Sequence, residues 1–238
     1  MKKHNMNISK NTDQKHKYFQ EIVKTVLEKF DGDEFTYIDT HAGVGHIDNY
    51  TGSPIIFIRE AFHYQNIYFK MVFCDKDKNT LQILNSHKGL IDALFIDSNH
   101  KFLISTSPDC NYVLDNLQIK GLQGFIFCDP NGNIPPFKHL ARFEHFDILI
   151  NVKITSIKRM LGKTNSCGVV RLSEYMTMVN KKYWFIKDQI DRCQQNPFIL
   201  LFATNNNYGN IPNMHDIRTE KGSVILTKHD LLKKELKK

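Results

Sequence analysis

The 238-residue sequence lacks any apolar run that approaches the ~20 residues needed to cross a membrane. No apolar stretch follows its first residues, Met-Lys-Lys-His-Asn-Met-Asn, so we do not expect a secretory signal. It has no C-x-x-C pair, so we expect no zinc site and reduced cysteine thiols. It also has no internal repeat. These absences predict a single domain, residues 1–238, in a cytoplasmic protein with no metal ion and no membrane attachment. The five cysteines are Cys74, Cys110, Cys128, Cys167 and Cys193.

The sequence also has fewer acidic than basic residues. It contains 25 aspartates and glutamates and 32 lysines and arginines, which gives a net charge of +7. A basic protein favours a polyanionic partner. The lysines at the two ends of the chain fit solvated termini as well as a binding surface. A third basic group follows a predicted strand, where loops commonly carry substrate contacts, and we expect it to bind nucleic acid. It comprises Lys153, Lys158, Arg159 and Lys163.

The most informative stretch is a short apolar strand, residues 35–39, that ends at Asp39 and enters the turn Thr-His-Ala-Gly-Val-Gly. Gly43 and Gly45 can adopt backbone angles and close approaches that a side chain forbids. A second predicted strand ends at Asp75, and a third ends at Asp129-Pro-Asn-Gly. Strands ending in acidic or glycine-rich turns, in this order, indicate an S-adenosylmethionine-dependent methyltransferase built on an open α/β sheet.

Apolar periodicity alternates between helical and extended spacing, which predicts a mostly parallel sheet of seven strands with the last strand antiparallel. Residues 1–11 are expected to be loosely attached, and residues 153–196 to form an inserted segment that contacts the substrate. Strands are expected at 35–39, 69–74, 102–105, 124–128, 146–152, 197–203 and 222–227. Helices are expected at about 14–30, from Ser53, at 77–98, after Pro108, and through 183–190. Thr12 or Asp13 should cap the first helix. The second helix should turn Ile55, Ile56, Ile58 and Phe62 inward.

Two families share motifs with this chain. Tyr37-Ile-Asp-Thr-His-Ala-Gly-Val-Gly45, the following Gly-Ser-Pro and a Lys-His pair in the first helix resemble the bacterial large-subunit ribosomal RNA adenine-N6 methyltransferases. Asp129-Pro-Asn-Gly132, Phe146-Asp-Ile-Leu-Ile-Asn151 and the stretch 198–205 resemble the three-Cys-motif partner proteins, a related methyltransferase-like group. The resemblance spans roughly residues 12–215. It implies a Rossmann-like class I methyltransferase fold that uses S-adenosylmethionine.

The resemblance also implies a cofactor site. Asp75 would accept hydrogen bonds from the ribose hydroxyls, and Asp109 from the adenine amino group. His16, His41 and Ser53 would donate hydrogen bonds to the methionine carboxylate. Lys15 would add positive charge there. Helix N-capping is the alternative for Asp75 and Asp109, and a surface histidine is the alternative for His16. The implied residues are Lys15, His16, Asp39, His41, Ala42, Gly43, Gly45, Ser53, Asp75, Asp109 and Cys110.

Asp129, Pro130 and Asn131 are the predicted catalytic residues. An exocyclic amine is a poor nucleophile because its lone pair is delocalised into the ring. The Asp129 carboxylate and the Pro130 carbonyl could each accept one N–H and direct the lone pair at the methyl group. Related motifs end in an aromatic residue that stacks on the flipped-out base, whereas this chain has a glycine there and leaves Tyr50, Phe137 or Tyr208 as substitutes. A plain Asp-Pro-Asn-Gly turn is the alternative.

Together these features predict methyl transfer to an exocyclic amine of nucleic acid, with adenine N6 of DNA or RNA as the first choice. One alternative is a non-catalytic protein of the same fold that binds nucleic acid or a protein partner. Another is a methyltransferase for a small molecule or a protein. DNA or RNA, the target site and the oligomeric state stay open.

Overall fold

The computed structural model of the protein describes residues 10–47, 50–94, 101–130, 133–153, 156, 171–188 and 198–230. Within these residues eight strands form one sheet in the order β10-β8-β9-β7-β6-β1-β4-β5, beside a separate ladder of β2 and β3. The strands of the large sheet are β1 (Glu34–Asp39), β4 (Tyr68–Cys74), β5 (Lys101–Ser107), β6 (Gly124–Cys128), β7 (Phe146–Lys153), β8 (Tyr183–Asp188), β9 (Phe198–Thr204) and β10 (His215–Asp216). The ladder consists of β2 (His46–Ile47) and β3 (Tyr50–Thr51).

The first five long strands are parallel, and β9 is antiparallel to both of its neighbours, β7 and β8. Strand order reverses between β1 and β6, and the carboxyl ends of the strands at such a reversal are where open α/β sheets generally bind ligands. This arrangement is the expected Rossmann-like, mostly parallel open α/β sheet. The large sheet has eight strands rather than the predicted seven, because β8 and β10 join it unpredicted and the strand expected at residues 222–227 does not form.

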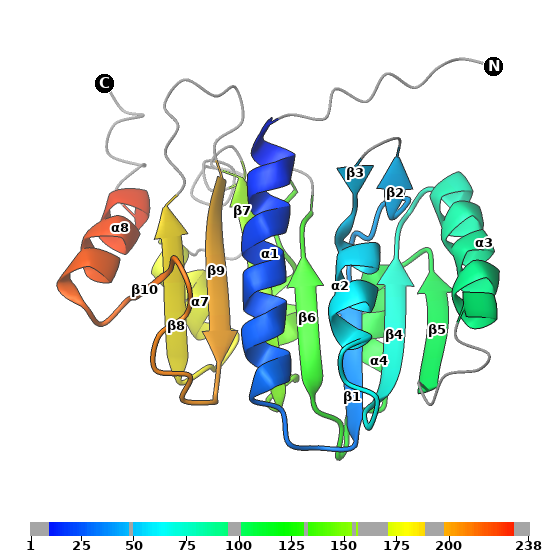
Figure 1. The fold of residues 1–238 in the computed structure, drawn as a ribbon. Coiled ribbons are helices and arrows are strands. Elements are labelled where there is room, and N and C mark those ends of the chain that lie inside the picture. Colours follow the sequence, from blue (N-terminus) through cyan, green and yellow to red (C-terminus); the bar gives the residue numbers. More distant parts are fainter. Residues whose placement is uncertain are drawn as a thin grey trace.

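Helices cover both faces of the sheet (Figure 1). One core cluster joins the sheet to α1, α2 and α3, and the other joins it to α4, α5 and α7. No helix among the described residues is long and apolar enough to span a bilayer. The helices are α1 (Lys10–Glu28), α2 (Ser53–Ala61), α3 (Lys78–Leu94), α4 (Cys110–Asn116), α5 (Phe137–Leu140), α7 (Leu172–Thr177) and α8 (Glu220–Asp230).

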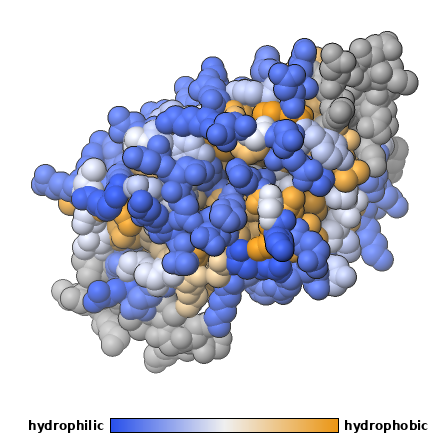
Figure 2. All heavy atoms as spheres, turned by 90° about the horizontal axis from the view of Figure 1, so that it is seen from below, coloured by the Kyte–Doolittle hydropathy of each residue, from blue (hydrophilic) through white to orange (hydrophobic). Residues whose placement is uncertain are grey.

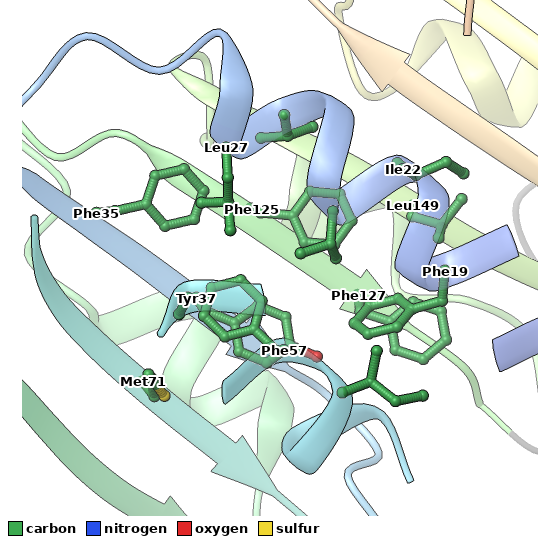
Figure 3. Close-up of a cluster of buried hydrophobic side chains, with 14 of the residues drawn as sticks. Phe19, Ile22, Leu27, Phe35, Tyr37, Phe57, Met71, Phe125, Phe127 and Leu149 are labelled. Atoms are coloured by element: carbon green, nitrogen blue, oxygen red, sulfur yellow. The ribbon is translucent and has the colours of Figure 1, made fainter. Parts of the chain in front are cut away.

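Helix α1 is held on the sheet by a buried apolar stripe that recurs at helical spacing. Phe19 is completely buried, with its ring centroid 4.6 Å from that of Phe127 and 6.3 Å from that of Tyr37 (Figure 3). Tyr37 in turn stacks on Phe57 of α2 at 3.8 Å. This aromatic cluster fixes the first turns of α1 over the carboxyl ends of β1 and β6.

The last elements differ from the prediction. Residues 183–188, expected in a helix, form β8, and residues 222–227, expected as the seventh strand, lie in α8. Short apolar runs fit either a helix or a strand, and β8 is settled by its pairing with β9 and β10. In α8 the side chain of Val224 is 63% exposed while Ile225 and Leu226 pack against the core, which is the one-sided burial of a surface helix.

Two predicted helix details are also wrong. Helix α1 begins at Lys10, so Thr12 and Asp13 lie inside it and neither is its N-cap. Phe62 directly follows α2 and is 43% exposed, although its spacing predicted an inward position. The strands expected at 35–39, 69–74, 102–105, 124–128, 146–152 and 197–203 are confirmed to within a few residues, the last of them as the antiparallel β9.

Candidate functional site

The turn after β1 is hydrogen-bonded to the strands on both sides of it. The Thr40 N–H donates to the carbonyl of Phe127 on β6 at 3.0 Å, and the Ala42 N–H donates to that of Cys74 on β4 at 2.8 Å. Gly43 and Gly45 have φ angles of 62° and 76°, in the left-handed region that favours glycine. The predicted glycine turn therefore lies at the carboxyl edge of the sheet, beside the point where strand order reverses.

Asp39 supports this turn from beneath. Its carboxylate accepts hydrogen bonds from the Tyr37 hydroxyl at 2.9 Å, the Ser53 hydroxyl at 2.6 Å and the His41 N–H at 3.1 Å. Complete burial raises the pKa of Asp39 to about 6, although these three donors oppose the rise. Because Asp39 is buried and bonded to the protein, it shapes the turn rather than facing an open site.

Asp75 lies where the prediction puts a ribose-binding carboxylate, at the end of β4 and beside the glycine turn. Its two oxygens accept from the N–H groups of Gly43 at 3.1 Å and Asp77 at 2.9 Å. Asp75 is not the N-cap of α3, since Asp77 accepts from the Asn79 N–H in that position. Each carboxylate oxygen retains a lone pair that a hydroxyl group could use.

Asp109 caps α4 by accepting from the Tyr112 N–H at 3.0 Å, and its side chain is exposed. Asp109 is therefore a helix N-cap, as the alternative prediction had it. Cys110 is the first residue of the same helix. One oxygen of Asp109 remains for another donor. Since β5 pairs with β4, Asp109 lies one strand beyond Asp75 along the carboxyl edge.

Asp129 is held in place by side chains from other parts of the chain. It follows β6, is only 6% exposed, and bonds to groups from two other elements. The Lys15 ammonium on α1 forms an ion pair with its Oδ2, and the Asn151 side-chain amide donates to its Oδ1 at 2.6 Å. Burial alone would raise the pKa of Asp129, but Lys15, Asn151 and the nearby charge of Lys153 hold it below its usual value. Asp129 is therefore ionised at neutral pH.

Two histidines lie near Asp129 and are neutral at pH 7. Burial, reinforced by the positive charge of Lys15, lowers the pKa of His16 to about 4. Burial also lowers the pKa of His41, whose ring nitrogen is 2.9 Å from the Thr40 hydroxyl. His16 is thus half-buried next to Lys15 rather than a free surface histidine, and each neutral ring can still donate one hydrogen bond.

Ser53 lies at the start of α2, facing the glycine turn. Its hydroxyl is committed to Asp39, so the predicted hydrogen bond to a methionine carboxylate would fall to backbone groups instead. Within the described residues, α2 begins without a capping side chain and without an acidic residue in its first turn. A helix end of this kind attracts a carboxylate through its N–H groups and its dipole.

Comparisons with known proteins leave the reaction and the substrate open. No family model and no curated protein matches the chain. Among solved structures it is similar to cofactor-bound Rv0187 from MTB, with 12% identity, a TM-score of 0.46, and coverage of 85% of this chain and 84% of that one. These likenesses are too distant to assign a reaction.

Two further structures show the same level of similarity. Spermidine synthase from Thermotoga maritima has 10% identity and a TM-score of 0.43 over 80% of this chain, which spans 60% of that protein's chain. CrArsM, an arsenic (III) S-adenosylmethionine methyltransferase from Chlamydomonas reinhardtii, has 12% identity and a TM-score of 0.40, with coverage of 78% of this chain and 72% of that one.

Two of the three aromatic residues proposed to stack on a base are wrongly placed for that role. Phe137 is 2% exposed and packs against Tyr175 in the core. Tyr208 lies at the amino-terminal edge of the parallel strands, where its hydroxyl donates to Asp147. It lines a cavity of about 290 Å³ there, at the end of the strands opposite to Asp129. Figure 2 shows the amino-terminal edge of the parallel strands, where patches of apolar residues are visible between hydrophilic ones. The side chain of Tyr50 is outside the described part.

The predicted nucleic-acid and catalytic residues are placed only in part. Lys153 ends β7, half-buried and close enough to Asp129 to lower its pKa. The rest of the predicted set, Asn131, Lys158, Arg159 and Lys163, lies outside the described residues, as does most of the segment 153–196. The described residues contain no group of three or more His, Cys, Asp or Glu side chains that could hold a metal ion.

Two contacts at this site were missed by sequence reasoning. The prediction gave Lys15 to the cofactor and did not pair it with Asp129, which is 114 residues away. It quoted Asn151 as part of a motif but gave it no role. In the structure Cys128 pairs with Ile150 in parallel register, which places the next residues, Asp129 and Asn151, side by side, and no local pattern in the sequence shows this register.

Proposed function

We propose that this protein transfers a methyl group from S-adenosylmethionine to an exocyclic amine in nucleic acid, with adenine N6 of DNA or RNA as the first choice. The observation that carries the proposal is Asp129. It is an ionised carboxylate held at the strand-order reversal, one strand from the glycine turn of β1. An acceptor fixed next to a nucleotide-binding turn is what an amine nucleophile requires.

The residues around the turn fit the cofactor. Asp75 offers acceptors to ribose hydroxyls, and Asp109 offers one to the adenine amino group. The uncapped start of α2 and the neutral donors His16 and His41 suit a methionine carboxylate. The backbone of Ala42, Gly43 and Gly45 permits close approach without side-chain obstruction. When bound, S-adenosylmethionine supplies an electrophilic methyl group on a sulfonium.

In the proposed reaction Asp129 orients the amine. One amine N–H donates to the carboxylate, and the nitrogen lone pair turns toward the methyl group. The N–C bond forms as the C–S bond breaks, with that electron pair staying on sulfur. The surplus proton leaves the nitrogen for water, because an acid whose pKa is lowered is a poor proton acceptor. The hydrogen bond to Asp129 would therefore stabilise the transition state more than the bound substrate, which raises the rate of methyl transfer.

A nucleic-acid substrate is supported by charge. The chain carries a net charge of +7, and Lys153 lies at the same edge of the sheet as Asp129. Lys158, Arg159 and Lys163, which follow in sequence, would extend this group along a phosphate backbone.

A non-catalytic binding protein is the second candidate, favoured by one observation. Both oxygens of Asp129 are already occupied by protein donors, Lys15 and Asn151. An amine could reach Oδ2 only if Lys15 moved aside or shared it. A protein that used this pair solely to fix α1 would bind cofactor and nucleic acid without turnover.

The test combines calorimetry with single-turnover transfer of a labelled methyl group to a panel of DNA and RNA oligomers. Asp75→Ala should weaken cofactor binding roughly tenfold or more, since charge-assisted hydrogen bonds are worth about 1.5–3 kcal/mol. Asp129→Ala should abolish turnover while cofactor binding stays near the wild-type value. Asp129→Asn should keep part of the activity, because an amide oxygen still accepts one hydrogen bond.

Folding must be monitored in the same samples, because Asp129→Ala leaves Lys15 as a part-buried charge without its partner. The double variant Lys15→Met/Asp129→Ala removes both charges and serves as the control. Wild-type binding of cofactor and nucleic acid with no methyl transfer would favour the non-catalytic alternative. Absence of cofactor binding by folded wild-type protein would contradict the whole proposal.

A further inference from the structure

An exocyclic amine has two N–H groups, so fixing its orientation takes two acceptors. Asp129 provides one. The Pro130 carbonyl, the second acceptor predicted from the sequence, accepts the Asn133 N–H at 2.9 Å in the turn that follows β6 and has one further lone pair. The other neighbours of Asp129 also carry hydrogen-bond acceptors.

Asn151 is next to Asp129 in the sheet. Cys128 pairs with Ile150 in parallel register, so the residues that follow them lie side by side at the carboxyl ends of β6 and β7. Side chains alternate between the faces of a strand. Leu149 packs in the cluster beneath α1 and Ile150 in the opposite one, so Asn151 points to the α1 face, where it meets Asp129.

The orientation of the Asn151 amide follows from the charge of Asp129. An ionised carboxylate only accepts hydrogen bonds, so the NH₂ group of Asn151 must face it, and the amide oxygen must face elsewhere. Asn151 is 3% exposed, and its Oδ1 is buried without a hydrogen-bond partner among the described residues. Buried amide oxygens nearly always have a donor. Asn151 Oδ1 belongs to the same amide group that donates to the carboxylate proposed to hold the target amine.

We propose that Asn151 Oδ1 is the second acceptor for the target amine, beside Asp129 Oδ2. This inference rests on the proposed function and names the group that selects for an NH₂ substituent. The Lys15 ammonium, bonded to Asp129 Oδ2, marks where a nitrogen donor fits. When the amine takes that place, one N–H donates to Asp129 and the other to Asn151. Both acceptors stay unprotonated through the methyl transfer described above.

Asn151→Leu removes the acceptor with little change in side-chain size, and Asn151→Asp keeps an acceptor while removing the donor to Asp129. The matched control is Asn205→Leu, because the Asn205 amide bonds to the Lys182 N–H and the Glu144 carbonyl near the amino-terminal edge of the parallel strands. Each variant is compared with wild type in methyl-transfer rate, cofactor affinity and melting temperature. Binding of an oligomer with one adenine is also compared with that of the same oligomer carrying purine, which lacks the amine.

We expect Asn151→Leu to lower the single-turnover rate at least tenfold and to abolish the preference for adenine over purine, with cofactor affinity unchanged. Asn151→Asp should keep part of the preference. Its activity should fall as pH rises, because two adjacent carboxylates hold one shared proton at low pH only. Asn205→Leu should lower the melting temperature while leaving the rate and the preference intact. A loss of stability alone would not change the adenine-to-purine ratio.

An active wild type whose Asn151→Leu variant keeps both its rate and its preference for adenine would overturn the role of Asn151 and leave the proposed function standing. A wild type that binds cofactor yet methylates no oligomer, and binds adenine and purine oligomers equally, would instead overturn the proposed function, and the role of Asn151 with it.

Discussion

His16 links the charge state of single residues to stability. Its pKa is about 4 in the folded protein and 6.5 in an unfolded chain, because burial and the charge of Lys15 disfavour the protonated ring. Between pH 6.5 and 4 the unfolded chain therefore binds a proton that the folded protein does not. Stability falls as pH falls through that window, by up to about 3 kcal/mol at ~1.4 kcal/mol per pKa unit.

His16→Gln should remove this acid-side loss, measured as the change in urea-unfolding free energy between pH 7 and pH 4.5 for the variant and the wild type. Asp39 acts in the opposite direction. Its pKa is raised from 3.8 to about 6, so the folded protein binds the extra proton and Asp39 adds stability as pH falls. Equal pH dependence in the variant and the wild type would show that the His16 ring is protonated in the folded protein like an exposed histidine.

At the scale of elements, α1 is the part of the structure that brings Lys15 and His16 to Asp129. Phe19, one turn further along, anchors this end of the helix among Tyr37, Phe125 and Phe127. Phe19→Ala should lower the unfolding free energy by about 3–5 kcal/mol, the usual cost of removing a fully buried phenylalanine. Chemical denaturation measures this directly.

Lys24→Ala is the control on the same helix. The Lys24 side chain is 63% exposed and forms an i,i+4 pair with Glu28, worth about 0.3–0.5 kcal/mol in exposed pairs. Phe19→Ala should also weaken cofactor binding, because the carboxyl-edge contacts depend on where α1 lies. A Phe19 variant as stable as the Lys24 variant would show that α1 does not dock through this cluster.

At the scale of the whole molecule, the net charge of +7 predicts that nucleic-acid binding weakens steeply with salt. Each phosphate contact contributes a log–log slope of about −0.7 to −0.9. Lys153→Glu should flatten the slope by about one contact while cofactor affinity stays unchanged. Lys24→Glu makes the same change in net charge on an exposed face of α1 and should leave the slope nearly as it was. Fluorescence anisotropy over a salt series measures both.

Identical slopes for the two variants would mean that net charge, and not the carboxyl edge of the sheet, attracts the nucleic acid. Charge reversal at Lys158 and Arg159 extends the series to the rest of the basic group. Salt-independent binding of the wild type would contradict phosphate recognition altogether.

The sequence by itself determined the parallel half of the sheet and the positions of the acids that end its strands. Asp39, Asp75 and Asp129 each directly follow a short apolar run, and this local pattern is enough to place them at one edge of a parallel sheet. The glycine turn was equally readable, because positive φ angles at Gly43 and Gly45 depend on residue type.

Only the tertiary structure decided what each acid bonds to and how the chain ends. Asp129 is paired with Lys15 and Asn151 by the docking of α1 and the register of β7, neither of which leaves a local signal. Likewise β8 and α8 exchanged their predicted types because both are short apolar segments. Burial against β9 and β10 on two sides makes one a strand, whereas contact on one face only makes the other a surface helix.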